Sequence, residues 1–147
     1  MNIQYVIINK NYFDEKNYKN YLNLLDESSN IDIPDFNKFN DHLKNILNQN
    51  STILVIKNNI NELIGSAKLI VDLKLNKRLS AIGHIEDVVI HKDYRGQGLG
   101  KKIIERLIEI AKSKNCYKII LQCSDKNTEF YEKCSFKSRG KNMELFV

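Results

Sequence analysis

The sequence has no tryptophan, one proline and only three cysteines among its 147 residues. The number of cysteines is odd, and the sequence has no CxxC pair among Cys116, Cys123 and Cys134. Both facts argue against a disulfide framework and against a zinc knuckle. The three histidines have no HExxH or CxxC companions, so a metal site has little support. We therefore expect free thiols in a reducing compartment and no bound metal.

Long apolar runs are also missing. No stretch approaches the roughly 18–20 apolar residues of a membrane-spanning helix. The segment from Met1 to Tyr5 lacks a basic start followed by an apolar stretch, so no secretory signal is predicted. With 42% hydrophobic and 28% charged residues, the composition is that of a globular protein. We expect one domain over residues 1–147, in the cytoplasm and without a membrane span.

The charge of the chain is mildly positive, at +5. This bias suits an anionic ligand such as a phosphorylated cofactor, and it also suits nucleic acid. However, the basic residues alternate with acids, as in the segment 101–106, and no helix-turn-helix or zinc-finger pattern is present. We therefore predict a small-molecule substrate and no nucleic-acid partner.

The spacing of apolar residues predicts an alternation of strands and helices. In chain order these are a strand at 5–8, helices over 18–25 and 34–47, strands at 52–57, 63–73 and 81–90, a helix carrying 103–111, a strand at 118–123, a helix over 127–133, and strands at 136–139 and 143–146. Pro34 is expected in the first turn of the second helix, and 74–80 is expected to be a loop. This order predicts an α/β fold with a mixed sheet flanked by helices on both faces.

Two local features interrupt this pattern. Glu86 and Asp87 are adjacent acids in the middle of a strand, which predicts an irregularity such as a β-bulge. The glycine-rich turn 95–100 follows that strand and opens a helix, the usual arrangement of an anion site built from unpaired main-chain N–H groups. A dinucleotide loop would need glycine at Lys101, and a Walker loop would need a hydroxyl at Lys102, so both fail. The pattern that fits is Arg/Gln-x-x-Gly-x-Gly, although an ordinary tight turn remains an alternative.

This loop resembles the pyrophosphate loop of the GCN5-related N-acetyltransferase (GNAT) superfamily. Four further segments, 83–89, 116–121, Asn127 and 130–134, resemble the glucosamine 6-phosphate N-acetyltransferases. The likeness is close over about residues 80–136 and loose before them. It implies the GNAT (acyl-CoA N-acyltransferase) fold, acetyl-CoA as cosubstrate, no metal, and a homodimer. It also implies direct transfer, in a ternary complex, of acetyl to the 2-amine of D-glucosamine 6-phosphate, which belongs to UDP-N-acetylglucosamine biosynthesis.

The resemblance also implies where the cofactor would bind. Main-chain groups at the end of the central strand would hold the pantetheine, and one N–H would polarise the thioester carbonyl. The glycine-rich turn would hold the pyrophosphate. The implied cofactor-binding residues are Val88, Val89, Ile90, Arg95, Gly96, Gln97, Gly98, Leu99, Gly100, Lys101 and Asn127.

Catalytic and substrate-binding residues follow from the same resemblance. Tyr131 would give a proton or hydrogen bond to the departing thiolate, with a core aromatic as its alternative. Glu86 and Asp87 would bind the sugar or help to remove an ammonium proton, with outward acids at a bulge as their alternative. The implied substrate-binding residues are Ser29, Lys74, Glu86, Asp87, Tyr117 and Lys118, and Lys74 could equally be a solvated loop charge.

Two positions depart from the family pattern. Gln122 stands where the family often has an aspartate, and Phe146 stands where several members have an arginine for the phosphate. Arg139 or Lys141 is a candidate to compensate for that arginine. These departures keep two alternatives open: a GNAT enzyme for another small amine, and a non-catalytic acyl-CoA-binding module.

Overall fold

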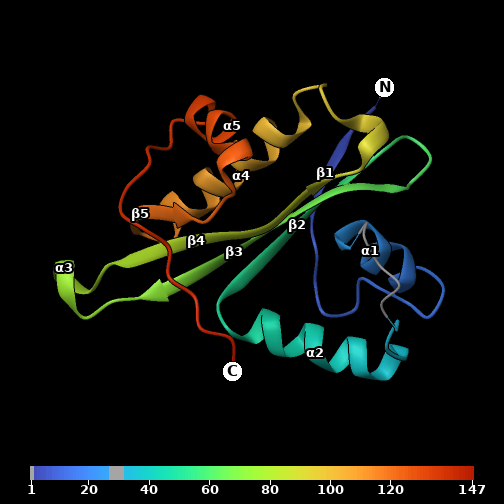
Figure 1. The fold of residues 1–147 in the computed structure, drawn as a ribbon. Coiled ribbons are helices and arrows are strands. Elements are labelled where there is room, and N and C mark those ends of the chain that lie inside the picture. Colours follow the sequence, from blue (N-terminus) through green and yellow to red (C-terminus); the bar gives the residue numbers. More distant parts are fainter. Residues whose placement is uncertain (1, 27–31) are drawn as a thin grey trace.

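The computed structural model describes residues 2–26 and 32–147, which form a five-stranded sheet with helices on both faces (Figure 1). The strands are β1 (Gln4–Ile7), β2 (Ser51–Lys57), β3 (Leu63–Leu73), β4 (Ala81–Ile90) and β5 (Cys116–Leu121). The helices are α1 (Tyr18–Leu25), α2 (Phe36–Asn48), α3 (Asn76–Leu79), α4 (Leu99–Ser113) and α5 (Thr128–Lys133), with short 3-10 turns at Lys92–Tyr94 and Asp125–Asn127. The predicted α/β fold with a mixed sheet is confirmed.

The strands lie in the sheet in the order of the sequence, β1-β2-β3-β4-β5. The pairs from β1 to β4 are antiparallel, and β4 and β5 are parallel because α4 crosses between them. Figure 1 shows α4 and α5 on one face of the sheet and α1 and α2 on the other. Both faces of the central strands are therefore covered.

The larger core lies between the sheet and α4. The apolar stripe of α4 that the sequence predicted is buried completely at Ile103, Ile104 and Leu107. These side chains pack against buried residues of β2 and β3 such as Ile56 and Leu69. Full burial of such a side chain contributes roughly 1.5–3 kcal/mol, so this stripe holds α4, and the loop before it, firmly on the sheet.

The second core lies under α1 and α2. Tyr21 of α1 and Phe39 of α2 are buried against Val55 of β2. Asp35 caps α2, with its side chain accepting a hydrogen bond from the N–H of Lys38 at 2.9 Å. The expectation that Pro34 lies in the first turn was wrong, because the aspartate cap places the helix start two residues later.

A bulge in β4 is confirmed. Ser66 of β3 pairs with Val89, but Lys68 pairs with Glu86, so one residue of β3 faces two residues of β4. Asp87 has a φ of 54°, the left-handed backbone that such a bulge requires here. The pairing of β4 with β5 ends at Ile85 opposite Leu121, so the last residues of β4 diverge from β5.

The end of the chain differs from the prediction. Strands at 136–139 and 143–146 were expected, but the structure assigns no strand to these residues. The side chains of Met143, Leu145 and Phe146 are 92%, 86% and 91% exposed. An extended segment becomes a strand only when it finds a partner ladder, and residues 136–146 pair with none of the described strands. Phe136 packs on the larger core, but the apolar side chains from Met143 onward are exposed.

Two smaller boundaries also differ. The predicted strand at 118–123 begins earlier and ends at Leu121, so Gln122 and Cys123 lie beyond it. The predicted loop 74–80 contains the short α3, but Lys77 and Arg78 have positive φ values there, so the segment turns rather than extends as a helix. None of the described helices is long and apolar enough to cross a membrane.

Candidate active site

A cavity of about 760 Å³ opens where β4 diverges from β5. It is lined by the end of β4, by the glycine-rich turn and by α5. The predicted cofactor-binding residues among its lining are Val88, Val89, Ile90, Arg95, Gly96, Gly98, Leu99, Gly100, Lys101 and Asn127. Gln97 belongs to the same turn but does not line the cavity. The structure thus brings together residues from three separate segments of the chain.

The first turn of α4 lines part of this cavity. Gly98 is the N-cap of the helix and has a φ of 77°, as does Gly96, a conformation that is costly for residues with a Cβ. The first N–H groups of α4 have no partner within the helix, and the helix dipole adds partial positive charge there. Lys101 lines the same end, so the site suits an anion.

α5 packs closely on the start of α4. A Cβ on Gly100 would lie 3.1 Å from the ring of Phe130, which is closer than ordinary contact. Glycine at this position therefore lets the two helices approach. Arg95 anchors the other side of the turn, where its Nε donates a hydrogen bond of 2.9 Å to the carbonyl of Ile90. The turn is consequently fixed at both of its ends.

Tyr131 extends from α5 into the cavity lining. Its ring packs edge-on against Phe130, with ring centroids 4.9 Å apart. Burial, together with the nearby Cys123 and Cys134, raises the pKa of the Tyr131 hydroxyl above its usual value. A tyrosine hydroxyl is protonated at neutral pH even at its ordinary pKa, so Tyr131 Oη is a hydrogen-bond donor in this cavity.

The two predicted acids lie beside this cavity rather than in its lining. Glu86 and Asp87 occupy the bulge immediately before Val88, and Lys68 of β3 reaches both carboxylates. Lys68 Nζ is 3.0 Å from Asp87 Oδ2 and 3.4 Å from Glu86 Oε2. Burial acts to lower the pKa of Lys68, but the hydrogen bonds and charges of the two acids outweigh it and raise the pKa. Lys68 is not among the residues predicted from the sequence, although a lone cation in an apolar strand was a usable signal.

α1 contacts the same bulge through a buried hydroxyl pair. The hydroxyl of Tyr21 lies 3.1 Å from Ser66 Oγ, and either oxygen could be the donor. Burial and the charge of Asp87 raise the pKa of Tyr21 to about 12, despite the opposing effect of the Ser66 hydrogen bond. Helix α1 thus also borders the acidic pair.

Three further predicted substrate residues lie elsewhere on the sheet. Lys74 is paired with the Asp72 carboxylate, and His84 Nε2 lies 3.8 Å from the same carboxylate. Lys118 is opposite Ile82, six residues before Val88 in β4, which corresponds to roughly 20 Å along the strand. Tyr117, beside Lys118, is 43% exposed. A single chain therefore holds these residues apart from the cavity.

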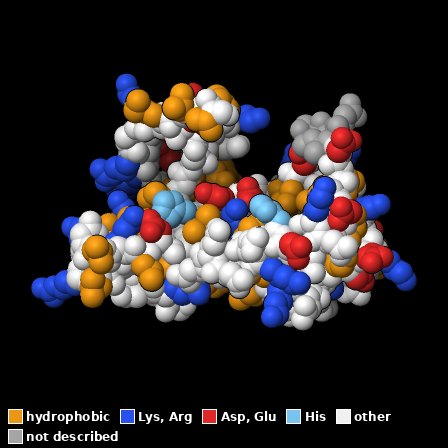
Figure 2. Space-filling view, turned by 90° about the horizontal axis from the view of Figure 1, so that it is seen from below, with side chains coloured by type: hydrophobic (Ala, Val, Ile, Leu, Met, Phe, Trp, Pro, Cys, Tyr) orange, Lys and Arg blue, Asp and Glu red, His pale blue; other side chains and the backbone are white. Residues whose placement is uncertain are grey.

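Figure 2 shows acidic, basic and histidine side chains together in a hollow between two raised parts of the molecule. Ser29, also predicted to bind the substrate, lies outside the described residues. Among residues 2–26 and 32–147, no group of three or more His, Cys, Asp or Glu side chains is arranged to hold a metal ion.

Gln122 and Phe146, the two residues that depart from the family pattern, lie near the end of β5 and in the C-terminal segment. The Gln122 side chain donates a hydrogen bond of 3.0 Å to Glu144 Oε1, and Asn142 donates to the same oxygen at 3.2 Å. Phe146 is almost fully exposed beyond them. A carboxylate from the C-terminal segment thus lies at the end of β5, next to the point where β4 and β5 diverge.

Comparison with known proteins points to one protein family. Residues 16–136 match the acetyltransferase (GNAT) family. The chain is 41% identical over 95 residues to glucosamine 6-phosphate N-acetyltransferase 1 of Dictyostelium discoideum, an alignment that covers 65% of this chain and 60% of the relative. It is 48% identical over 83 residues to glucosamine 6-phosphate N-acetyltransferase of Trypanosoma brucei brucei, covering 56% of each chain. The matches thus span little more than half the length of these relatives.

Solved structures resemble nearly the whole fold. A crystal structure of a Trypanosoma brucei acetyltransferase has a TM-score of 0.89 and 30% identity, and the superposition covers 99% of this chain and 100% of that one. Glucosamine-6-phosphate N-acetyltransferase from Arabidopsis thaliana has a TM-score of 0.88 and 27% identity, with 99% of both chains covered. The fold, the glycine-rich turn at the start of α4 and these matches together lead to one conclusion: the chain belongs to the acetyltransferase (GNAT) family.

Proposed function

We propose that this chain is an acetyl-CoA-dependent N-acetyltransferase that acetylates the 2-amine of D-glucosamine 6-phosphate. One observation supports this most strongly: the diverging end of β4, the glycine-rich turn and Tyr131 all line one cavity of about 760 Å³. That volume is within the range of small-molecule sites. The names of the relatives at 41% and 48% identity support the choice of sugar phosphate.

The residues present fit the cofactor. A diphosphate needs main-chain N–H groups that it can approach closely, and the turn offers two glycines in the left-handed conformation before the first turn of α4. Lys101 and Asn127 line the same cavity and would contact the cofactor. Val88, Val89 and Ile90 would hold the pantetheine with main-chain groups that β5 does not pair. Acetyl-CoA, when bound, supplies the acetyl group as a thioester.

Acetyl transfer requires that the ammonium group of the substrate lose a proton and that the leaving thiolate gain one, and side chains at this site would carry out both steps. Tyr131 Oη carries a proton at neutral pH, as a tyrosine does even at its ordinary pKa of 10.0, so it would donate a hydrogen bond or that proton toward the leaving thiolate. The carboxylates of Glu86 and Asp87, oriented by Lys68, would bind the amino sugar and receive the ammonium proton, directly or through water. No covalent acyl-enzyme is required, because positioning two substrates together supplies most of the rate advantage.

We also propose a homodimer. Lys118 lies roughly 20 Å along β4 from the cavity, Tyr117 is beside it, and Lys74 follows the end of β3 that pairs with Ala81. The three residues would therefore reach a sugar phosphate more readily in a second copy. The apolar side chains of the C-terminal segment support the same proposal, since they are exposed among the residues that the structure describes.

A second candidate is a GNAT enzyme for another small amine. It is supported by Glu144, whose carboxylate is held by Gln122 and Asn142 at the end of β5, where it would disfavour an anionic substrate nearby. A free-thiol assay with acetyl-CoA separates the candidates. We expect thiol release with glucosamine 6-phosphate. Thiol release only with an amine that carries no phosphate would show that another amine is the substrate. Binding of coenzyme A without thiol release for any amine would indicate a non-catalytic binding module.

A further inference from the structure

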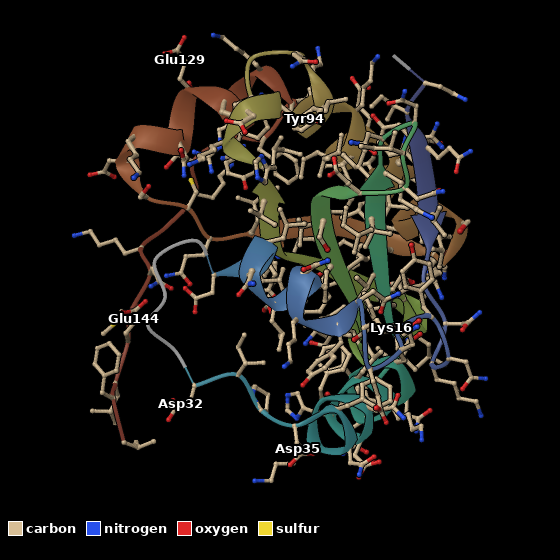
Figure 3. The ribbon with its side chains drawn as sticks, turned by 90° about the vertical axis from the view of Figure 1, so that its right-hand side faces the viewer. Lys16, Asp32, Asp35, Tyr94, Glu129 and Glu144 are labelled. Atoms are coloured by element: carbon tan, nitrogen blue, oxygen red, sulfur yellow. The ribbon has the colours of Figure 1, made fainter. Side chains whose placement is uncertain are left out.

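Tyr94 separates the cofactor cavity from a second hollow. This hollow, of about 1060 Å³, lies between α1, the hairpin of β2 and β3, and the 3-10 turn after β4. Tyr94 lines both spaces, so its ring forms part of the wall between them. Figure 3 labels Tyr94 in the upper part of the molecule, well away from Glu144 on the C-terminal segment. The hydroxyl of Tyr94 is held from the side of the hairpin, by Asn58 at the end of β2.

Asn58 is a buried amide with only 3% of its surface exposed. Its Oδ1 accepts hydrogen bonds from the N–H groups of Ile60 at 3.1 Å and Glu62 at 2.9 Å. Its Nδ2 donates to Glu62 Oε2 at 2.7 Å and to the hydroxyl of Tyr94 at 3.1 Å. Both polar atoms of the side chain are used, as a buried amide requires. Asn58 thus closes the hairpin turn and fixes Tyr94 with one side chain.

Tyr94 is the last residue before the glycine-rich turn, which begins at Arg95. The chain leaving β4 is attached to the hairpin at two points. The N–H of His91 donates to the carbonyl of Ile64 at 2.8 Å, and the hydroxyl of Tyr94 is held by Asn58. The segment between these two points is a short 3-10 turn, in which the N–H of Tyr94 donates to the carbonyl of His91 at 2.9 Å. The start of the turn therefore has a fixed position relative to the sheet.

We propose that Asn58 is a positioning residue for the diphosphate-binding turn and that it acts through the hydroxyl of Tyr94. The proposal rests on the proposed use of coenzyme A. A main-chain anion site binds well only when its N–H groups are held in the binding geometry before the ligand arrives. Asn58 supplies part of this preorganisation from outside the site, through a side chain that does not itself line the cavity. The expected consequence is tighter cofactor binding rather than faster chemistry.

The variant Tyr94→Phe tests this directly, because it removes the hydroxyl and keeps the ring. We expect the dissociation constant for coenzyme A, measured by calorimetric titration, to rise by about three- to tenfold, the effect of losing one hydrogen bond. The KM for acetyl-CoA should rise by a similar factor, whereas kcat should change less. Tyr5→Phe is the matched control, since the buried hydroxyl of Tyr5 has no hydrogen-bond partner among the described residues.

A double-mutant cycle identifies the route of the effect. Asn58→Ser should weaken coenzyme A binding in the wild-type background and have little effect on it when Tyr94 is already phenylalanine. If Tyr94→Phe binds coenzyme A as tightly as wild type, the inference is overturned while the proposed function stands. If wild type itself fails to bind, the proposed function is overturned and this inference with it. Should Asn58→Ser not fold, the titration of Tyr94→Phe still decides.

Discussion

Lys68 Nζ lies 3.0 Å from Asp87 Oδ2 across the bulge that ends the regular part of β4. The lysine side chain is only 17% exposed, whereas the aspartate is 57% exposed. Lys68 therefore belongs to the rigid sheet, and the carboxylate it holds faces the open side of the molecule. This pair connects the irregular backbone of β4 with the acids that we propose to act on the amino sugar.

Replacing Lys68 with methionine should lower kcat/KM for the amine and leave the protein folded. Two adjacent carboxylates would lose the cation that orients them, and kcat/KM for the amine should fall about tenfold, as for one charged hydrogen bond. The free energy of unfolding should fall by about 1 kcal/mol, since the acids remain half exposed. Lys112→Met is the control, because it breaks an exposed pair with Glu109 on α4. Equal activity of both variants would remove the role assigned to Lys68.

Tyr131→Phe should lower kcat by about 100-fold, the lower end of the usual contribution of a general acid. Binding of coenzyme A should change little, because the ring that packs on Phe130 is kept. Steady-state kinetics and a calorimetric titration on the same preparation measure the two effects. A kcat within twofold of wild type would show that Tyr131 is only a packing residue.

Gly98→Ala should weaken coenzyme A binding and destabilise the protein by about 1–2 kcal/mol, because Gly98 has a left-handed backbone that a Cβ disfavours. The matched control is Gly140→Ala. Gly140 has a similar φ of 71° and equally open surroundings, but it lies in the C-terminal segment. Titration of both variants with coenzyme A should show weaker binding for Gly98→Ala alone. The same dissociation constant for both would refute the main-chain site at the start of α4.

Stability should fall between about pH 10 and pH 12 because of Tyr21. The pKa of its hydroxyl is raised to about 12 in the folded protein, from 10.0 for the ordinary group, so the folded state holds a proton that the unfolded state releases. At pH 11.5 this costs roughly 2 kcal/mol relative to pH 9. Urea unfolding at both pH values should therefore show a smaller loss for Tyr21→Phe than for wild type. An identical loss in the two proteins would contradict the assignment.

Deletion of residues 141–147 should convert a dimer into a monomer. This segment carries Met143, Leu145, Phe146 and Val147, all exposed in the single chain. Light scattering after size-exclusion chromatography at micromolar concentration measures the change in mass. Leu75→Ser is the control, since Leu75 is a 92% exposed apolar residue in the turn after β3, outside the segment. A full-length chain that is already monomeric would refute the homodimer.

The sequence predicted most of the fold because each prediction depended on residues close together in the chain. The buried stripe of α4 follows from its apolar spacing, and the bulge follows from two adjacent acids within one strand. The turn 95–100 follows from its glycines. The C-terminal strands were predicted with the same reasoning and were wrong, since an alternating pattern cannot say whether a partner strand is available.

What the sequence by itself determined is therefore local: most of the helices and strands, and the place of the glycine-rich turn before α4. The tertiary structure alone decided the partners of the polar side chains. Lys68 reaches Asp87 from a neighbouring strand, and Asn58 reaches Tyr94 across 36 positions of sequence. Such contacts depend on strand order and register, which arise from packing of the whole chain and leave no mark in the spacing of nearby residues.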